Sequence, residues 1–461
     1  MDRKSLLLSG LGVLMIVLTA CGGLPATATS APAQDLIGTM VAETMTAMGM
    51  DATVPPTDVP TIAPLETGAP TVLPTVPVVL TVAYVKDNNA WVWFEGGSPL
   101  QLTAVGDVND VRISSDGTRV AYLRNTGSLS HELWVINSDG SNDHVLLSQA
   151  DLQATYTGLP GDMPAGIGVF QFDWQPGTHE LFYNTRPLYE GPGLGGYDDL
   201  QMVNADTSVK STLFTAGEGG KFKFSPDGNR LAVITSTSIS LVNADGTHLY
   251  SDVLVYPSVI TYSEYLYYPN TVWAADSNSL KVVIPPADPL ADPLTPSNIY
   301  SLAVDGSPAV MLGSIMAMPF NWPDEAISPD LNHLGFADPT GYSGSGVRDL
   351  NLANGDGSGV VLYLTADGAE FLGWLPNSLQ FTFQAASGPD VGIHVSSTAE
   401  GYFTLTSDPS QVLANSINWV DDTHYLSIWQ NSGIKELKFS ILEGPQTTVD
   451  SGQIWSYSFT N

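Results

Sequence analysis

One short phrase recurs along this chain and constrains the fold more than any other feature. Its clearest copy is FSPDGNRLAV at 224–233, and further copies are ISSDGTRVAY at 113–122 and ISPD at 327–330. Looser copies start at Trp174, Trp273, Trp374 and Trp419. Self-similarity at intervals of this length marks an array of small repeated units that bury their apolar faces against one another.

Each copy combines the same elements in the same order. A short apolar strand runs into Ser-Pro-Asp-Gly, where Pro suits the first central position of a tight turn and Asp and Gly favour its close. A second strand follows at once, and a third ends in Asn-x-Asp-Gly, as at 137–140 and 243–246. A fourth strand closes the unit. Four antiparallel strands of this size are typical of one β-propeller blade.

The number of copies predicts the size of the ring. Seven first strands begin near Val111, Phe172, Phe222, Val272, Ala326, Leu372 and Ile417. Segment 82–103 contains strands two to four of a further blade, and 454–459 supplies a first strand. Pairing of these chain ends would close an all-β propeller of eight four-stranded blades and leave no open sheet edge in the ring. Seven blades is the alternative if one weak copy is an insertion.

These phrases resemble the repeats of TolB-type, WD40-like β-propellers. The same repeats build the propeller of the dipeptidyl peptidase IV and prolyl oligopeptidase families. The resemblance covers residues 81–461 and is most specific at 112–140 and 222–246. It implies a propeller and a binding role, and it carries over no activity.

The N-terminal part of the chain differs in composition from the repeats. A basic start and an apolar run over 1–20 predict a signal peptide, and Leu-Thr-Ala-Cys at 18–21 resembles the lipobox of bacterial lipoproteins. Cys21, the single cysteine, is then the lipidation site, which implies attachment to the outer face of a bacterial membrane. An ordinary signal peptide is the alternative. Residues 21–80 are expected to form a Pro/Thr-rich stalk with a short helix near 35–48.

Charge narrows the classes of partner. The chain has 15 Lys and Arg against 47 Asp and Glu, a formal net charge of −32. Nucleic-acid binding requires clustered positive charge that displaces counterions, and this composition excludes it. Charged residues make up 13% of the chain, so we expect a surface rich in Ser, Thr, Asn and Gly. An envelope protein or a carbohydrate is the expected partner.

The longer connections predict the binding face. Those at 151–167, 186–198, 256–270, 285–298 and 338–347 all join strand two to three, or strand four to the next blade. Propeller connectivity places these two classes on the same face, where long loops on a rigid scaffold commonly bind ligands. The candidate ligand-binding residues are aromatic: Tyr189, Tyr197, Tyr262, Tyr265, Tyr267, Tyr268 and Trp322.

The sequence indicates a binding protein without catalytic residues, metal ligands or a cofactor. The hydrolase motif Gly-x-Ser-x-Gly of the related peptidases is not found. His179, His333 and His424 precede second strands of different blades and are interpreted as turn residues. The alternative function is an exported glycoside or peptide hydrolase with acidic residues at the propeller mouth.

Overall fold

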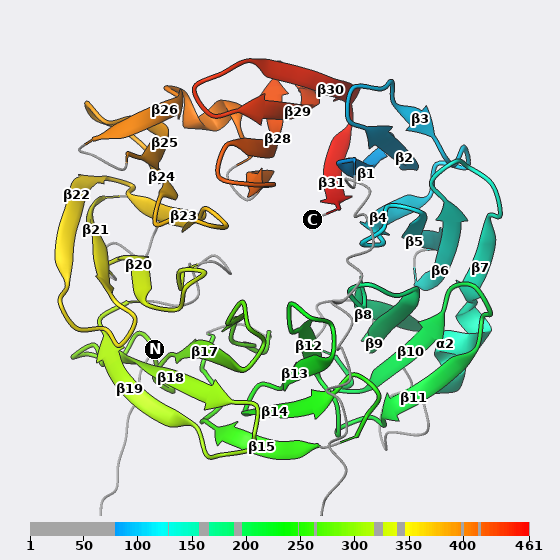
Figure 1. Cartoon of the computed structure of the whole chain (residues 1–461), viewed down its shortest axis with the longest axis horizontal. Helices are drawn as coiled ribbons and strands as arrows, with labels where there is room; N and C mark the ends of the chain where they lie inside the picture. Colours follow the sequence, from blue (N-terminus) through cyan, green and yellow to red (C-terminus); the bar gives the residue numbers. More distant parts are fainter. Residues whose placement is uncertain are drawn as a thin grey trace, which may run out of the picture. The chain divides into compact units, whose positions relative to one another are not determined.

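Short strands of alternating burial pair in sequence order and form eight antiparallel sheets arranged in a ring (Figure 1). The computed structural model describes residues 79–127, 129–155, 166–188, 196–247, 249–261, 265–317, 326–338, 346–397, 401–413 and 416–460. All of them belong to one unit, Pro74–Asn461. The predicted signal peptide, Cys21, the stalk and its short helix lie outside the described residues.

Each sheet is one blade. The blades are numbered in chain order, and the strands of each blade are given from the inner strand to the outer strand. Blade 1 contains β31 (Ile454–Phe459), β1 (Thr81–Lys86), β2 (Asn89–Phe94) and β3 (Leu100–Gln101). Blade 2 contains β4 (Val108–Ile113), β5 (Arg119–Gly127), β6 (Ser130–Asn137) and β7 (His144–Leu147). Blade 3 contains β8 (Gly166–Trp174), β9 (Glu180–Leu188), β10 (Leu200–Asn204) and β11 (Lys210–Phe214). Blade 4 contains β12 (Lys221–Phe224), β13 (Arg230–Ile234), β14 (Ser238–Asn243) and β15 (Tyr250–Val255).

The second half of the ring repeats this order. Blade 5 contains β16 (Thr271–Trp273), β17 (Ser279–Ile284), β18 (Ser297–Ala303) and β19 (Val310–Ile315). Blade 6 contains β20 (His333–Ala337), β21 (Val347–Asn354) and β22 (Val361–Asp367). Blade 7 contains β23 (Glu370–Trp374), β24 (Phe381–Ala385), β25 (Gly392–Ser396) and β26 (Tyr402–Thr406). Blade 8 contains β27 (Asn418–Trp419), β28 (His424–Asn431), β29 (Ile434–Ile441) and β30 (Gln446–Gly452).

The predicted all-β, eight-bladed propeller is confirmed, with two local differences. In blade 6 the expected first strand is reduced to a bridge between Ile327 and Leu334, although the turn at Ser328 is kept. The connection predicted at 151–167 begins inside a helix, α2 (Gln149–Thr155). Asp151 accepts hydrogen bonds from the backbone N–H and hydroxyl of Ser148, a capping arrangement that the Ser-x-x-Asp spacing encodes. A short 3-10 helix, η2 (Pro409–Gln411), precedes blade 8.

The core lies between neighbouring blades rather than inside any one of them. One cluster joins Leu133 of blade 2 to Leu181 of blade 3, and another joins Leu241 of blade 4 to Leu280 of blade 5. Each of these leucines is at most 1% exposed. A sheet in this ring therefore covers its two apolar faces only by stacking on the next sheet.

The recurring Ser-x-Asp-Gly turn owes its sequence to a closed set of hydrogen bonds. The Ser225 hydroxyl, which is 0% exposed, donates to the Asp227 carboxylate at 2.6 Å and accepts from the backbone N–H of Arg230 at 3.0 Å. Although burial raises it, hydrogen bonds from Ser225 and Asn229 lower the pKa of Asp227 to about 2. Gly228 has a φ of +70°, and an added Cβ would lie 2.7 Å from the carbonyl of Pro176 in blade 3.

The chain ends close the ring as predicted. β31 pairs antiparallel with β1, in a register that sets Val82 opposite Phe459. The backbone N–H of Thr81 donates to the Thr460 hydroxyl, and the N–H of Thr460 donates to the Thr81 carbonyl, both at 3.0 Å. At the other end of the pair, Lys86 forms an ion pair with Asp450 at 2.6 Å. Blade 1 therefore exists only because both ends of the propeller contribute strands to it.

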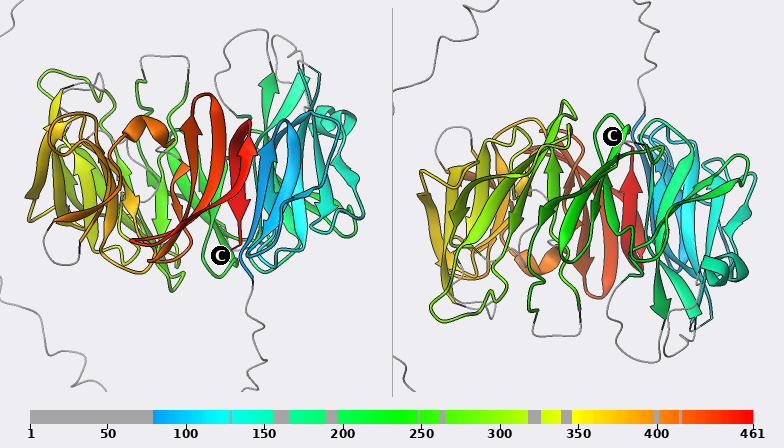
Figure 2. Two further views of the ribbon diagram at one scale, coloured as in Figure 1. Left: turned by 90° about the horizontal axis from the view of Figure 1, so that it is seen from above. Right: turned by 90° about the horizontal axis from the view of Figure 1, so that it is seen from below.

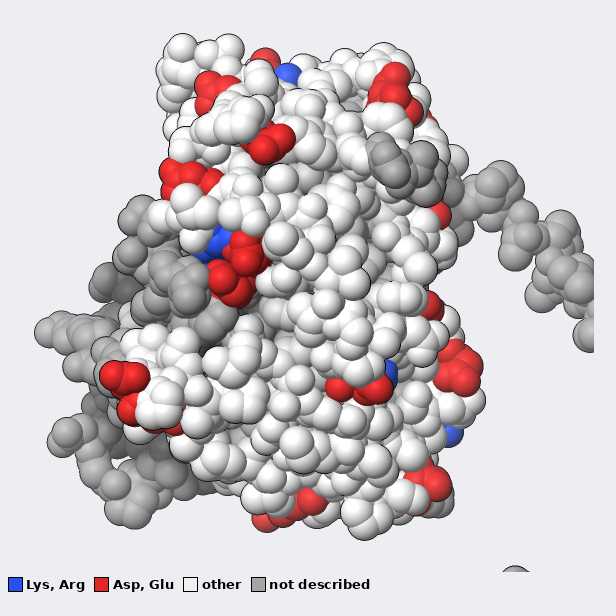
Figure 3. All heavy atoms as spheres, turned by 90° about the vertical axis from the view of Figure 1, so that its left-hand side faces the viewer, with Lys and Arg blue, Asp and Glu red and all other residues white. Residues whose placement is uncertain are grey.

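The outer surface around blade 6 carries few charges. Figure 3 shows scattered acidic side chains, few basic ones and a large uncharged area. The low charge expected from composition is visible there, but the uncharged area is not purely polar. Val347, Val361 and Leu362 on β21 and β22 are 65%, 63% and 54% exposed.

Removal of residues 453–461 is expected to abolish cooperative thermal unfolding of the propeller. Loss of β31 exposes the edge of β1 and uncovers the apolar faces that flank it, which favours association of edge strands. Circular dichroism melts and size-exclusion chromatography measure both effects. Removal of residue 461 alone is the control. A truncated protein that stays monomeric and melts like the full chain would contradict ring closure as the basis of stability.

Candidate functional site

All the longer connections of the ring lie on one of its two faces. Turns between strands one and two, and between three and four, are short and lie on what we call the turn face. The longer connections predicted from the sequence all join strands two and three or lead to the next blade, so they lie on the opposite, long-loop face. Figure 2 shows the ring edge-on, with β31 ending beside the start of β1 on one face. That face is the turn face, because β1 is a second strand.

The predicted ligand-binding aromatics have different environments. Tyr189, Tyr262 and Trp322 lie outside the described residues. Tyr265 is 62% exposed on the long-loop face, whereas Tyr267 is half-buried. Tyr197 is half-buried and packs against the core cluster of blades 2 and 3. Tyr268 is 9% exposed and belongs to the core cluster of blades 4 and 5. Among the described aromatics, Tyr265 therefore offers the most open surface.

Tyr268 also lines a cavity of about 610 Å³ in the wall of the central channel, here called the wall cavity. The cavity runs along blades 3 to 5, from Tyr268 and Asn270 of the long loop to Trp174 and Pro176 near the turn face. Lys221, the first residue of β12, lies over two aromatic rings in it. Its Nζ is 5.1 Å from the Phe170 ring centroid and 4.9 Å from that of Tyr268. Such contacts favour a cation held against an aromatic surface.

Phe170 is placed there by a distortion of the inner strand of blade 3. The pairing of β8 with β9 shifts register between Val169 and Gln171, so Phe170 is the extra residue of a β-bulge. Gly196 passes close to this ring, since an added Cβ would lie 2.9 Å from Phe170 Cδ1. Bulges in inner strands commonly redirect a side chain beside a functional site.

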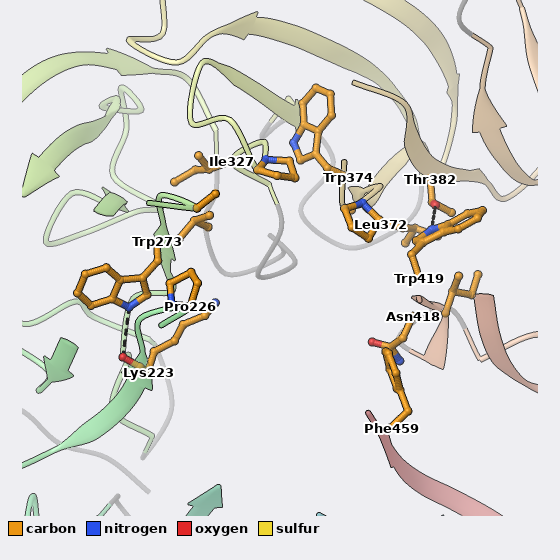
Figure 4. Close-up of a pocket in the computed structure, with 16 residues that line it drawn as sticks. Lys223, Pro226, Trp273, Ile327, Leu372, Trp374, Thr382, Asn418, Trp419 and Phe459 are labelled. Atoms are coloured by element: carbon orange, nitrogen blue, oxygen red, sulfur yellow. Dashed lines mark hydrogen bonds between the residues drawn. The ribbon is translucent and has the colours of Figure 1, made fainter. Parts of the chain in front are cut away.

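A second cavity, of about 470 Å³, lies at the turn face and is here called the turn-side cavity (Figure 4). Its lining comes from the inner strands and first turns of blades 4 to 8, together with Phe459 at the C-terminal end. The turn position that Pro226 occupies in blade 4 is repeated by Ala275, Pro329 and Pro376, which border the cavity. The repeated turn therefore places a ring of small apolar groups around this mouth of the channel.

Tryptophans at the ends of inner strands connect neighbouring blades beside these cavities. The indole N–H of Trp174 donates to the carbonyl of Arg112 at 3.0 Å, and that of Trp273 donates to Lys223 at 3.2 Å. Trp374 repeats the contact with Ala326 at 2.9 Å. In each case the acceptor carbonyl belongs to the blade before the tryptophan's own. It comes from the next-to-last residue of that blade's inner segment. These tryptophans thus fix the channel wall, and their rings pack into the blade interfaces.

Asp198, on the long-loop face, is held in an unusual conformation. Its φ is +49°, and its carbonyl accepts from the backbone N–H groups of Gly217 and Gly219 at 3.0 and 2.6 Å. Burial raises the pKa of Asp198 to about 6, although the Tyr268 hydroxyl, which donates to Oδ1 at 3.2 Å, lowers it in part. The neighbouring charge of Asp199 raises it further. A left-handed, poorly hydrated carboxylate costs stability, which is a recurring feature of functional sites.

The turn histidines contact aspartates. His179 Nδ1 lies 2.7 Å from Asp206 and Nε2 lies 3.1 Å from Asp116 of blade 2. Burial lowers the pKa of His179, but these carboxylates outweigh it and raise the pKa. His424 contacts Asp421 in the same way at 2.8 Å. Within the described ranges no three His, Cys, Asp or Glu side chains form a potential metal site. The same part of the chain contains no helix long and apolar enough to span a membrane.

Comparison with known proteins gives matches among solved structures only. No protein-family model and no curated protein matches the sequence. Among solved structures, TolB from Acinetobacter baumannii matches 60% of this chain and 61% of its own at 13% identity and a TM-score of 0.30. Dipeptidyl peptidase 4 of Porphyromonas gingivalis matches 77% of this chain and 54% of its own, at 11% identity and a TM-score of 0.48. In both cases less than two thirds of the known chain is covered.

The propeller domain of the Trilobed protease from Pyrococcus furiosus is also similar. It matches 75% of this chain and 97% of its own, at 10% identity and a TM-score of 0.42. These values describe a likeness of fold alone. The chain's own ring of eight antiparallel sheets shows that it is a β-propeller in fold. The resemblance inferred from the repeated turns is confirmed at that level.

The repeat pattern did not reveal the channel residues. Lys221, Lys223 and Phe170 were not candidates, because an inner strand that faces a lumen has the same alternation as one that faces a neighbour. One signal was present: KFKF at 221–224 places two of the few lysines in one inner strand of a strongly acidic chain.

Substitution of Asp198 by Asn is expected to stabilise the propeller at pH 7 by about 1–2 kcal/mol. A carboxyl whose folded pKa is raised from 3.8 to about 6 loses native stability as pH rises through that interval, and Asn has no charge to bury. Asn also tolerates the positive φ. Thermal melts at pH 4 and pH 7 test this: the gain should appear at pH 7 and vanish near pH 4. Equal gains at both pH values would refute the electrostatic cause.

Proposed function

We propose that this chain is a non-enzymatic binding propeller, exported and anchored through Cys21 to the outer face of a bacterial membrane. Its partner is an envelope protein or a glycan that contacts the long-loop face. The observation that carries the proposal is the wall cavity, which joins a long-loop segment, Tyr268–Thr271, to the inside of the ring. A partner resting on that face could reach the channel without any change of fold.

The chemistry of this region favours binding. Tyr265 is 62% exposed on the same loop, and Tyr268 and Phe170 border the cavity with Lys221 across their rings. Flat aromatic groups beside hydrogen-bonding groups suit protein hot spots and sugar rings alike. The bulge at Phe170 and the strained backbone of Asp198 lie beside this cavity. Both features cost folding stability, and such costs are concentrated at functional sites.

The lining of the cavities gives little support to the hydrolase alternative. Glycoside hydrolysis by the common route uses two carboxyl groups about 5–9.5 Å apart. Of the described residues that line the two cavities, Asp173 alone carries a carboxyl group. Asp199, on the long-loop face, accepts hydrogen bonds from the backbone N–H and the hydroxyl of Thr185 at 2.8 and 3.0 Å.

The direction of the chain supports an outward-facing binding surface. β1 starts on the turn face, so the segment that leads back to Cys21 enters the ring from that side. The described start of the propeller is therefore on the face opposite the long loops. A tether on one face and a binding surface on the other suit a protein that presents itself to partners beyond the membrane.

Site-specific photo-crosslinking tests the binding face. A benzophenone amino acid at Tyr265 should give a discrete adduct in intact envelopes, because this side chain is exposed on the long-loop face. The same group at Leu379, which is 51% exposed on the turn face, is the matched control. Sensitivity of the adduct to protease or to glycosidase separates a protein from a glycan. Adducts at 379 but not at 265 would refute the proposed face.

Replacement of Cys21 by Ala is expected to abolish lipid labelling and release the protein from the membrane fraction. The thiol is the only group at this position able to carry the thioether-linked lipid, and the rest of the described chain offers no spanning helix. Metabolic labelling with a palmitate analogue and membrane fractionation measure both effects. Unchanged sedimentation with membranes in the Ala variant would contradict a lipid anchor.

A further inference from the structure

The repeat assigns one equivalent channel position to each blade, and its residues are not distributed evenly. This position is the residue immediately before the last residue of each inner segment, as Lys223 precedes Phe224. Charged residues occupy it in three consecutive blades: Arg112 in blade 2, Asp173 in blade 3 and Lys223 in blade 4. The remaining blades have uncharged residues there: Val272, Ala326, Gly373, Asn418 and Ser458. At this position the charged residues are therefore confined to three neighbouring blades.

Lys223 is the charged residue placed to meet a ligand. It lines both the wall cavity and the turn-side cavity, and Figure 4 shows its side chain extending past Pro226 toward the open centre. Across the described residues no ion pair joins its ammonium group, whereas Arg112 is paired with Asp110 at 2.8 Å. The chain has a net charge of −32, so its electrostatic potential is mostly negative. The half-buried ammonium group of Lys223 is a local positive charge within that potential.

Apolar side chains make up much of the turn-side cavity opposite Lys223, together with the polar side chains of Asn418 and Thr382. Leu372 lies across the opening from Lys223 in Figure 4, and Phe459 lies further along the opening, beside Asn418. Ile417, which precedes Asn418, also lines the cavity. Pro329 and Pro376 complete this side, and the turn-side cavity contains no carboxylate among its described lining residues. A flat or branched hydrocarbon body would be covered there while a charge stays near blade 4.

Asp173 does not cancel the cation. It lines the wall cavity but not the turn-side cavity, and its Oδ1 accepts from the backbone N–H of Trp174 at 2.9 Å. The surrounding blades restrict hydration of this carboxyl and raise its pKa, even though solvent reaches it through the channel. Asp173 would therefore weaken the binding of an anion at Lys223, but it does not take the place of that anion.

We propose that the turn-side cavity is a binding site for a small organic anion, with Lys223 pairing with its acidic group and the Leu372, Ile417 and Phe459 surface covering its apolar body. A volume of about 470 Å³ falls in the range of small-molecule sites and suits a ligand of one to three rings. This site lies at the opposite mouth from the long-loop face, so it does not depend on the macromolecular partner proposed above.

A pair of dyes that differ in one group tests the assignment. 1-Anilinonaphthalene-8-sulfonate carries a sulfonate on an apolar body, and N-phenyl-1-naphthylamine is the same body without the charge. The folded propeller should bind the anionic dye at one site, with quenching of tryptophan fluorescence because Trp273, Trp374 and Trp419 line the cavity. Lys223→Met keeps the aliphatic stem and should weaken anionic-dye binding about tenfold, since a charge-assisted hydrogen bond is lost.

Matched variants separate the site from general dye adsorption. Lys435→Met on β29 removes a lysine away from the channel and should leave both affinities unchanged, and Lys223→Gln serves if the Met variant does not fold. Asp173→Asn should strengthen binding of the anionic dye. Uncharged-dye binding should respond to Ile417→Asp but not to Lys223→Met. Equal affinity of the wild type and the Lys223 variants for the sulfonate, or saturation at many sites, would overturn the proposal.

Discussion

Stacking of neighbouring sheets is the interaction on which every other feature of this structure depends. No blade has a core of its own, since Leu181 of blade 3 shares a buried cluster with Leu133 of blade 2, and Leu280 of blade 5 shares one with Leu241 of blade 4. Such an array gains stability only when each sheet has a neighbour on both faces. The ring satisfies that condition once the first and last strands of the propeller share one blade.

The repeated turn converts this packing into precise alignment. Ser225 and its equivalents hold the turn from within, and Gly228 lets the turn of blade 4 pass against Pro176 of blade 3. Tryptophan indoles add a directional bond from one inner strand to the wall of the preceding blade. The channel is consequently rigid along its wall, while the connections on the long-loop face can vary without disturbing it.

The sequence was sufficient for the fold and much less so for the site. Ser, Pro, Asp and Gly at fixed offsets announce a turn because only a few backbone conformations satisfy them, and seven such signals plus two matching chain ends specify the ring. Burial was harder to predict. Tyr265 and Tyr268 are the same residue type and lie close together in the same loop. Tyr268 nevertheless packs in the core, whereas Tyr265 faces solvent. Lys223 faces the channel because the whole ring closes around it, and no local sequence pattern encodes that closure.

The position of the chain's entry point also has a mechanical consequence. β1 begins at the turn face and runs across the thickness of the ring between β31 and β2, with six paired positions to β2. Tension on the N-terminal segment would therefore act along the strand, so that the hydrogen bonds on both sides of β1 would be sheared together rather than opened one after another. A propeller built this way resists unfolding when it is pulled from its N-terminal end.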